Sequence, residues 1–523
     1  MTSRPNRILR SFATVGGWTM ASRVLGFLRD IAMATIVGTG PLAEAFFVAF
    51  RLPNMFRRFF AEGAFNTAFV PMFAARLEEG GKDQAKEFAQ QAISGLFAAL
   101  LILTLLAQLA TPWLVWALAS GFDAERQALA ETFTRIVFPY IVFISLAALF
   151  SGVLNAFGRF AAAAAAPVLL NVIWIAALGL AWTAGWDVGL TLSWAIFAAG
   201  LAQLALVWMA AKRLGLGLLP RRPRLTPQMK RLVVVGIPAA LAGGVMQINL
   251  LVGTQVASYF EGAVAWLWMA DRVYQLPLGA IGVAIGVVLL PELARRFRAG
   301  DAEGTAHAMN RAGEFSLVFT LPSAVALVLV PQTIVTALFE RGAFTAEDSA
   351  QTALVLAVYG VGLPTFVLQK VLQPAFFARE DTRTPLRYAV ISMVINLVVA
   401  IGLAPVIGFL AAALATTLAG AANLWLLWRG VQRLSPEYMM DAQLASRLPR
   451  IALASLGMGA VILGIAHGLE YLLPGWAGVT VIAVVTGGMV SYGVFGFALG
   501  AFSMSELKSA LRRSKRQPEG REP

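Results

Sequence analysis

Long apolar runs, separated by short charged or Gly- and Pro-rich breaks, recur along the whole chain. A run of about 20 apolar residues is long enough to cross a bilayer as a helix. No polar segment between the runs is long enough to fold as a soluble domain. The pattern predicts an all-α polytopic membrane protein with fourteen spanning helices, at residues 10–38, 42–75, 88–110, 131–156, 160–183, 189–211, 231–258, 263–293, 314–338, 351–377, 386–405, 409–428, 450–468 and 477–502.

The composition supports this fold class, because 59% of the 523 residues are hydrophobic and only 13% are charged. Soluble domains have about 25% charged residues. Cytoplasmic loops of membrane proteins hold an excess of lysine and arginine. If the N-terminus is cytoplasmic, 31 of the 41 lysines and arginines fall in cytoplasmic segments, and only Arg126 and Arg341 fall in the opposite loops. We therefore predict that both termini lie inside the cell.

The two halves of the chain resemble each other at an offset of about 220 residues. VPMFAARL at 70–77, for example, aligns with LPELARRF at 290–297. Six helices in each half would give both halves the same orientation, as in transporters built from parallel repeats. We predict two six-helix lobes joined by a linker and followed by two further helices. The predicted boundaries are an N-lobe at 1–218, a basic cytoplasmic linker at 219–230, a C-lobe at 231–430, helices 13 and 14 within 431–504 and a basic cytoplasmic tail at 505–523.

Some basic residues lie within the predicted spans, where a charge costs at least about 2.5 kcal/mol. They are Arg23, Arg29, Arg51, Arg57, Arg58, Arg135, Arg272 and Lys370. Arg135 is close to a helix end, where it suits an interfacial anchor, and Lys370 is assigned no role. At about 100° per residue, the charged residues of the first helix share an arc of about 120°, and those of the second helix share a similar arc. These sets are Arg23, Arg29 and Asp30 in the first helix, and Arg51, Arg57, Arg58 and Glu62 in the second.

Two explanations of the deep arginines stay open. They could pair with local acids, and the nearest candidates are Asp30, Glu62 and Asp271. The deep basic residues outnumber those acids, so a surplus should face a water-filled cavity or an anionic ligand. A guanidinium group suits forked hydrogen bonding to phosphate oxygens. The residues favour a cationic cavity between the two lobes and a substrate that carries phosphate.

Several function classes are not expected. The chain has no cysteine, and His307 and His467 lie far apart in the sequence, so we expect no metal centre, no cofactor and no His-based catalysis. A membrane enzyme would need an acid/base or metal constellation at the surface, but the outer loops are short and the inner loops basic. The net charge of +13 follows from topology and from attraction to anionic lipid, so nucleic-acid binding is not expected. A transporter remains, and a multidrug cation antiporter would carry carboxylates where this chain carries arginines.

Four segments together resemble the MurJ (MviN) family of lipid II flippases in the multidrug/oligosaccharidyl-lipid/polysaccharide (MOP) superfamily. They are SRVLGFLRD (22–30), AFFVAFRLPNMFRRFFAEGAFNTAFVP (45–71), WMADRVYQLPLGAIGVAIGVVLLPEL (268–293) and AREDTRTP (378–385). The resemblance covers essentially the whole chain. It implies flipping of lipid II, an undecaprenyl-diphosphate-linked disaccharide pentapeptide, to the periplasmic leaflet of the inner membrane by alternating access. A flippase for another polyprenyl-diphosphate-linked oligosaccharide fits the arginines equally well, and only the motifs favour lipid II.

The resemblance also implies site residues and partners. The residues implied to bind the diphosphate are Arg23, Arg29, Arg57 and Arg272. Glu44 and Glu62 are implied to hold gate or cavity arginines in one conformational state. The remaining cavity and gating residues are Asp30, Arg51, Arg58 and Asp271. The implied partners are lipid II, membrane lipids and the machinery of cell-wall synthesis or division.

Overall fold

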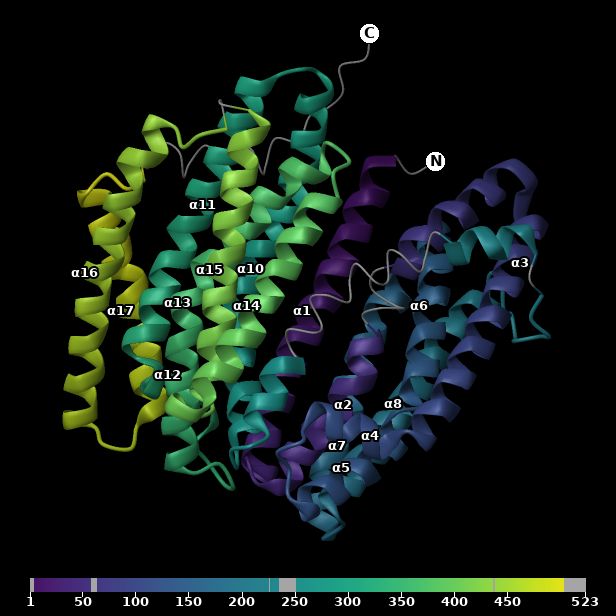
Figure 1. Ribbon diagram of the computed structural model, residues 1–523, viewed down its shortest axis with the longest axis horizontal. Helices are drawn as coiled ribbons and strands as arrows, with labels where there is room; N and C mark the ends of the chain where they lie inside the picture. Colours follow the sequence, from purple (N-terminus) through teal and green to yellow (C-terminus); the bar gives the residue numbers. More distant parts are fainter. Residues whose placement is uncertain (1–3, 58–63, 225, 235–250, 436–437, 503–523) are drawn as a thin grey trace. The chain divides into compact units, whose positions relative to one another are not determined.

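The computed structural model describes residues 4–57, 64–224, 226–234, 251–435 and 438–502. Within these ranges, the side chains of 4–13, 56–57, 64–67, 280 and 282–288 are left undescribed. The described part of the chain is helical throughout and contains no strand (Figure 1). This confirms the predicted all-α fold class.

The described helices belong to two compact units. Unit 1 comprises Met1–Trp268 together with Arg341–Asp348, and unit 2 comprises Met269–Glu340 together with Ser349–Pro523. The predicted lobe boundaries, with an N-lobe at 1–218 and a C-lobe at 231–430, stay a prediction.

In the residues that the structure describes, unit 1 contains eight labelled helices and the start of a ninth. They are α1 (Arg4–Val37), α2 (Pro41–Arg57), α3 (Ala64–Leu109), α4 (Thr111–Leu118), α5 (Ala124–Val137), α6 (Tyr140–Ala156), α7 (Ala161–Ala184), α8 (Val188–Lys212) and the first residues of α10 (Ala263–Arg298). Helix α7 packs against α1 and α8, α6 packs against α3 and α8, and α2 packs against α5. The contacts of α1 with α7 and of α2 with α5 carry the polar networks described below.

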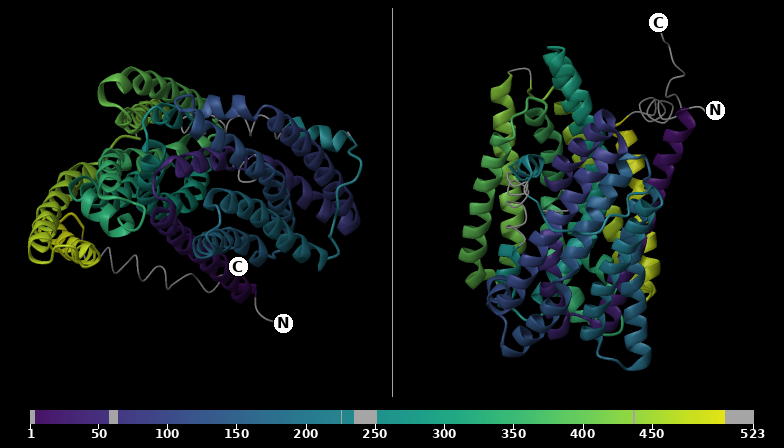
Figure 2. Two further views of the ribbon diagram at one scale, coloured as in Figure 1. Left: turned by 90° about the horizontal axis from the view of Figure 1, so that it is seen from below. Right: turned by 90° about the vertical axis from the view of Figure 1, so that its right-hand side faces the viewer.

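Unit 2 contains most of α10 and the later helices. They are α11 (Ala302–Leu329), α12 (Pro331–Phe339), α13 (Ala346–Phe377), α14 (Arg383–Ile407), α15 (Leu410–Leu434), α16 (Ala442–Leu472) and α17 (Ala477–Ala498). Helices α14 and α15 form one hairpin, and α16 and α17 form another that packs on α11 and α12 (Figure 2). The α14–α15 turn contains Gly408 at φ 63°, a conformation that glycine adopts without steric cost.

Helix starts and breaks follow local chemistry. Four helices begin after an aspartate whose side chain accepts a hydrogen bond from a first-turn N–H. These caps are Asp123, Asp187, Asp301 and Asp441. Pro139 and Pro331 stand where α6 and α12 begin, because proline cannot continue the preceding hydrogen-bond ladder.

The predicted helices 160–183 and 189–211 match α7 and α8 within one residue at each end. The predicted break between 75 and 88 is present, because the two helices that share the label α3 meet there at a kink at Gly81 (φ 69°), but both helices extend into the predicted loop. The predicted start at 314 is wrong, since the Asp301 cap begins α11 at Ala302. A hydrophobicity pattern does not detect these additional helical turns, because their residues include charged ones.

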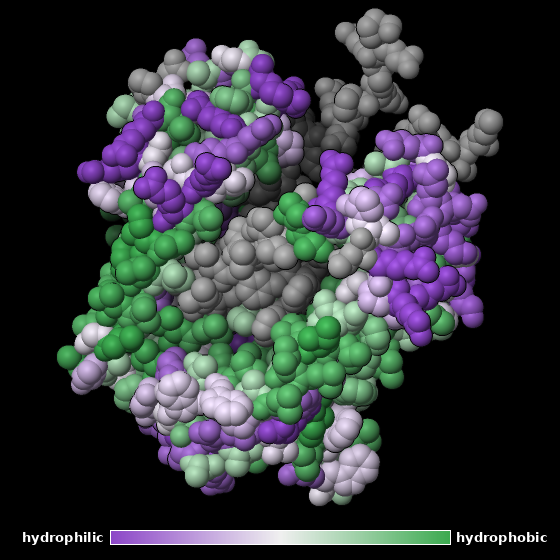
Figure 3. Space-filling view, turned by 45° about the vertical axis from the view of Figure 1, so that its right-hand side comes forward, coloured by the Kyte–Doolittle hydropathy of each residue, from purple (hydrophilic) through white to green (hydrophobic). Residues whose placement is uncertain are grey.

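Ten helical stretches in the described part of the chain are long and apolar enough to cross a membrane. Hydrophobic surface along the helices is flanked by hydrophilic residues at their ends (Figure 3). On α17, Ile482 and Met489 are exposed by 66% and 73%, as expected of side chains that face lipid. The structure therefore supports a multi-pass membrane protein.

Candidate functional site

Arg29 of α1 is buried and held by three side chains. Its Nε and Nη2 donate to Asp30 Oδ1 at 3.1 and 2.8 Å, and its Nη1 donates to Asn171 Oδ1 on α7 at 3.0 Å. The Arg29 Cζ also lies 4.5 Å from the centroid of the Trp174 ring, within the range of a cation–π contact. The local pairing that the sequence left open for Asp30 is thus made by Arg29.

Asn171 links the Arg29 guanidinium to the backbone of α1 by hydrogen bonds. Its Nδ2 donates to the Ser22 carbonyl oxygen at 2.9 Å, and a Cβ at Gly26 would lie 3.6 Å from the same nitrogen. Arg23, in contrast, is exposed and makes no hydrogen bond with a described residue. The charged arc predicted for the first helix is therefore divided: Arg29 and Asp30 are buried, with Arg29 bonded to α7, whereas Arg23 is exposed.

A second buried network joins α2, α5 and α10. Glu44 is fully buried, and its Oε2 accepts from Arg126 Nη1 at 3.0 Å. Its Oε1 accepts from the Val264 N–H at 3.1 Å, which satisfies one of the N–H groups at the start of α10 that lack a helical acceptor. The carboxylate also lies in the first turn of α2, where the helix dipole favours a negative charge.

Arg126 is a functional candidate that the sequence pattern missed. The pattern places it in an outer loop, but the residue is only 7% exposed. Its Nε donates to Asp123 Oδ2 at 3.2 Å, and its backbone N–H donates to Asp123 Oδ1 at 2.9 Å. This backbone hydrogen bond lowers the pKa of the Asp123 carboxyl below its ordinary value. Asp123 three residues before Arg126 is the helix-cap spacing, the one sequence signal for this arrangement.

Arg51 contacts an aromatic cluster formed by residues of α2, α7 and α10. Phe47 stacks on Trp268 with ring centroids 4.7 Å apart, and Phe50 meets Trp174 edge to face at 5.1 Å. Arg51 is half-buried, with its Cζ 5.4 Å from the Trp268 centroid. The Arg51 guanidinium therefore lies over the Trp268 ring, within the range of a cation–π contact.

The remaining predicted site residues are placed as follows. In unit 2, Asp271 and Arg272 of α10 are half-buried, and Gln275 Nε2 donates to Asp271 Oδ2. Arg57 ends α2, but its side chain is outside the described ones. Arg58 and Glu62 lie outside the described residues. Among the residues that the structure describes, no group of three or more His, Asp or Glu side chains could hold a metal ion.

The segment Arg341–Asp348, between α12 and α13, packs within unit 1. The Ala343 N–H donates to the Thr35 carbonyl oxygen at 2.8 Å. Asp348 is buried and accepts from Trp266 Nε1 at 2.9 Å and from the Thr345 N–H at 2.8 Å. Thr39 Oγ1 donates to the same carboxylate. A single aspartate thus ties this segment to the α1–α2 turn and to the start of α10.

We expect Asp348→Ala to lower the free energy of unfolding by about 2 kcal/mol, because buried donors would lose their acceptor. Thermal unfolding of the purified variant in detergent measures the loss. Asp83→Ala, at an exposed aspartate of α3, is the control and should change stability by less than about 0.5 kcal/mol. Equal melting of the two variants would contradict the assigned role of Asp348.

The chain is similar to known transporters over nearly its whole length. A model of the family described as "Lipid II flippase MurJ" matches residues 33–505. The chain is 45% identical to the "Probable lipid II flippase MurJ" of Rhizobium meliloti (strain 1021) over 522 residues, 97% of this chain and 96% of that protein. It is 34% identical to the "Lipid II flippase MurJ" of Burkholderia cenocepacia over 472 residues, 88% of this chain and 90% of that protein.

Solved structures agree with the sequence matches. The fold matches "Lipid II flippase MurJ, inward closed conformation" with a TM-score of 0.77 and 25% identity, covering 93% of this chain and 99% of that one. It also matches an inward-facing multidrug resistance MATE family transporter of the MOP superfamily with a TM-score of 0.69 and 17% identity, covering 80% of this chain and 96% of that one. The second match shows a shared fold alone. Together with the family match, these similarities show that the chain belongs to the MurJ family of lipid II flippases.

Proposed function

We propose that this protein flips lipid II from the cytoplasmic to the periplasmic leaflet of the inner membrane by alternating access. The observation that carries the proposal is the family match over residues 33–505. The deep arginines agree with it, because guanidinium groups suit a substrate with a diphosphate. The protein acts as a transporter and not as an enzyme, as do the flippases whose name its relatives bear.

We further propose that the diphosphate is bound by four arginines. They are Arg23, Arg29, Arg57 and Arg272. In this structure, the Arg29 guanidinium donates hydrogen bonds to Asp30 and Asn171. Binding of phosphate by Arg29 would therefore exchange the Asp30 carboxylate for a phosphate oxygen. Such an exchange would couple ligand binding to the contact between α1 and α7, because Asn171 bridges the same guanidinium and the backbone of α1.

The proposed gating residues are further acids and arginines. They are Asp30, Glu44, Arg51, Arg58, Glu62 and Asp271, to which the structure adds Arg126 as the partner of Glu44. The Glu44 carboxylate accepts from both Arg126 and the Val264 N–H at the start of α10. A movement of α10 relative to α2 would therefore break the hydrogen bond to Val264, and a movement of α5 relative to α2 would break the buried ion pair. A gate of this kind works only if the ligand binds one conformational state more tightly than the other.

We propose lobes at 1–218 and 231–430, joined by the linker 219–230, with both termini in the cytoplasm. The distribution of lysine and arginine supports this topology. The remaining segments, 431–504 and 505–523, are assigned to two further spanning helices and a cytoplasmic tail. Contact with the machinery of cell-wall synthesis or division is part of the same proposal.

Lipid II binding by native mass spectrometry tests the proposed site. We expect Arg57→Ala and Arg272→Ala each to weaken binding at least about tenfold, which is about 1.4 kcal/mol, because a charge-assisted hydrogen bond to phosphate is lost. Arg135→Ala is the control, since Arg135 donates to the Gln108 carbonyl oxygen at 2.8 Å and lies outside the proposed site.

The substrate is tested in the same experiment with a polyprenyl-diphosphate lipid that lacks the peptide. Selective binding of lipid II that both site variants lose would support the proposal. Equal binding of the two lipids by the unmodified protein would favour a flippase for another polyprenyl-diphosphate-linked oligosaccharide. Equal binding of lipid II by all variants would remove Arg57 and Arg272 from the site.

A further inference from the structure

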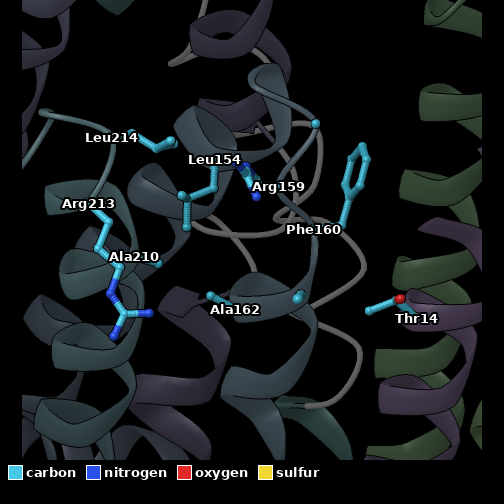
Figure 4. A pocket seen from close by; sticks show the side chains of 10 residues that line it. Thr14, Leu154, Arg159, Phe160, Ala162, Ala210, Arg213 and Leu214 are labelled. Atoms are coloured by element: carbon cyan, nitrogen blue, oxygen red, sulfur yellow. The ribbon is translucent and has the colours of Figure 1, made fainter. Parts of the chain in front are cut away.

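A cavity of about 540 Å³ opens at one end of unit 1. It lies between the N-terminal half of α1, the turn from α6 to α7, and the end of α8. Arg213 reaches toward it from α8, Arg159 from the α6–α7 turn, and Thr14 from α1 (Figure 4). None of these residues belongs to the proposed diphosphate site.

The cavity carries positive charge that no described acid neutralises. The residues that line it include Arg159 and Arg213 and no aspartate or glutamate. Both arginines are exposed, and neither guanidinium makes a hydrogen bond or an ion pair with a described residue. Two guanidinium groups with all their donors available offer a site for an anion with several oxygens.

The start of α7 adds to the same charge. This helix of 24 residues begins at Ala161, and its N-cap residue, Phe160, provides no side-chain hydrogen bond to the first turn. Ala161 and Ala162 line the cavity, so their end of the helix, with its partial positive charge, borders it. Phosphate groups bind well at such helix starts.

The remaining walls are apolar and distinguish a lipid from a soluble phosphate. Leu154, Phe160 and Leu214 also line the cavity (Figure 4). The cavity also lies at the ends of three helical stretches that are long and apolar enough to span a membrane, ending at Ala156 and Lys212 and beginning at Ala161. Lipid head groups are found at this level of a bilayer.

We propose that this cavity binds the head group of an anionic phospholipid. Arg159 and Arg213 bind the phosphate oxygens, the start of α7 adds its dipole, and the leucines pack against the glycerol and the first methylenes. Basic pockets between spanning helices at the cytoplasmic surface bind lipid head groups in this way. The proposal does not depend on lipid II binding, because its residues are separate from those assigned to the diphosphate.

Lipid retention tests the proposal. The protein is reconstituted in nanodiscs with equal amounts of phosphatidylglycerol and phosphatidylcholine, extracted into mild detergent, and analysed by native mass spectrometry. We expect the unmodified protein to retain phosphatidylglycerol in preference to phosphatidylcholine by about tenfold, as two basic groups at a membrane surface would give. The double variant Arg159→Gln/Arg213→Gln should retain the two lipids equally.

A matched control is Arg222→Gln/Arg224→Gln, which removes the same charge from an exposed loop and should keep the preference. Loss of the preference in both double variants would mean that net charge alone attracts the lipid, and would overturn the proposal. Retention of the preference in Arg159→Gln/Arg213→Gln would also overturn it. Thermal unfolding of each variant shows whether it is folded.

A variant that keeps both charges tests the cavity itself. Ala210 lines the cavity, and Ala210→Trp should fill it and abolish the lipid preference. If Ala210→Trp still prefers phosphatidylglycerol, the arginines act from the open surface, and the cavity is not the site. Soluble glycerol phosphate serves as a competitor: failure to displace the lipid supports a phospholipid site, whereas full displacement would assign the cavity to a soluble phosphate.

Discussion

Glu44→Ala is expected to lower the free energy of unfolding by about 3–5 kcal/mol, the range found when one partner of a buried ion pair is removed. Arg126 would keep its charge in a site where it is only 7% exposed. The Val264 N–H at the start of α10 would lose its acceptor as well. Both losses arise from one carboxylate, so the effect should exceed that of any other single acidic residue described above.

Thermal and denaturant unfolding in a fixed detergent measure this effect. Glu125→Ala is the matched control, because Glu125 is an exposed acid of α5. The double variant Glu44→Ala/Arg126→Leu should be more stable than Glu44→Ala, since no uncompensated charge stays buried. If Glu44→Ala unfolds like Glu125→Ala, the ion pair contributes nothing to the folded state, and its proposed gating role is lost with it.

Arg29→Lys is expected to reduce lipid II flipping at least about tenfold although the charge is retained. A lysine ammonium group carries all its hydrogen-bond donors on one nitrogen. It cannot reproduce the fork in which Nε and Nη2 donate to Asp30 while Nη1 donates to Asn171. It also cannot bind two phosphate oxygens side by side. Flipping by the reconstituted protein in vesicles, measured from the appearance of lipid II in the opposite leaflet, tests this expectation.

Asn171→Ala separates the structural role of Arg29 from its proposed role in binding. This substitution removes the hydrogen bonds to Arg29 and to Ser22 but leaves the guanidinium in place. We expect it to destabilise the protein by about 1–3 kcal/mol and to leave lipid II binding largely intact. If Asn171→Ala and Arg29→Lys reduce binding equally, Arg29 supports the fold and does not contact the diphosphate.

Much of the fold could be predicted from the hydrophobic pattern. In α7 and α8, long apolar stretches end at Gly- or charge-containing breaks, and the predicted boundaries agree with the structure within one residue. Spanning helices can be predicted from the sequence because, in a bilayer, every spanning segment must satisfy its own backbone hydrogen bonds and present apolar side chains to lipid. The deep arginines were visible for the same reason, since a charge in an apolar run is an obvious exception.

The partners of those charges were decided by tertiary structure alone. Asp30 could be paired with Arg29 from adjacency, but Asn171 lies 142 residues away and contacts Arg29 only because α7 packs on α1. Glu44 has no basic residue near it in the sequence with which to pair. The sequence pattern places its partner, Arg126, in a loop, and only the packing of α2 on α5 shows that Arg126 is buried beside Glu44. Hydropathy depends on the residue type at each position, so the sequence alone determined which segments enter the membrane. Ion pairs form wherever packing brings opposite charges together, so only the folded chain decides which arginines are held by protein groups.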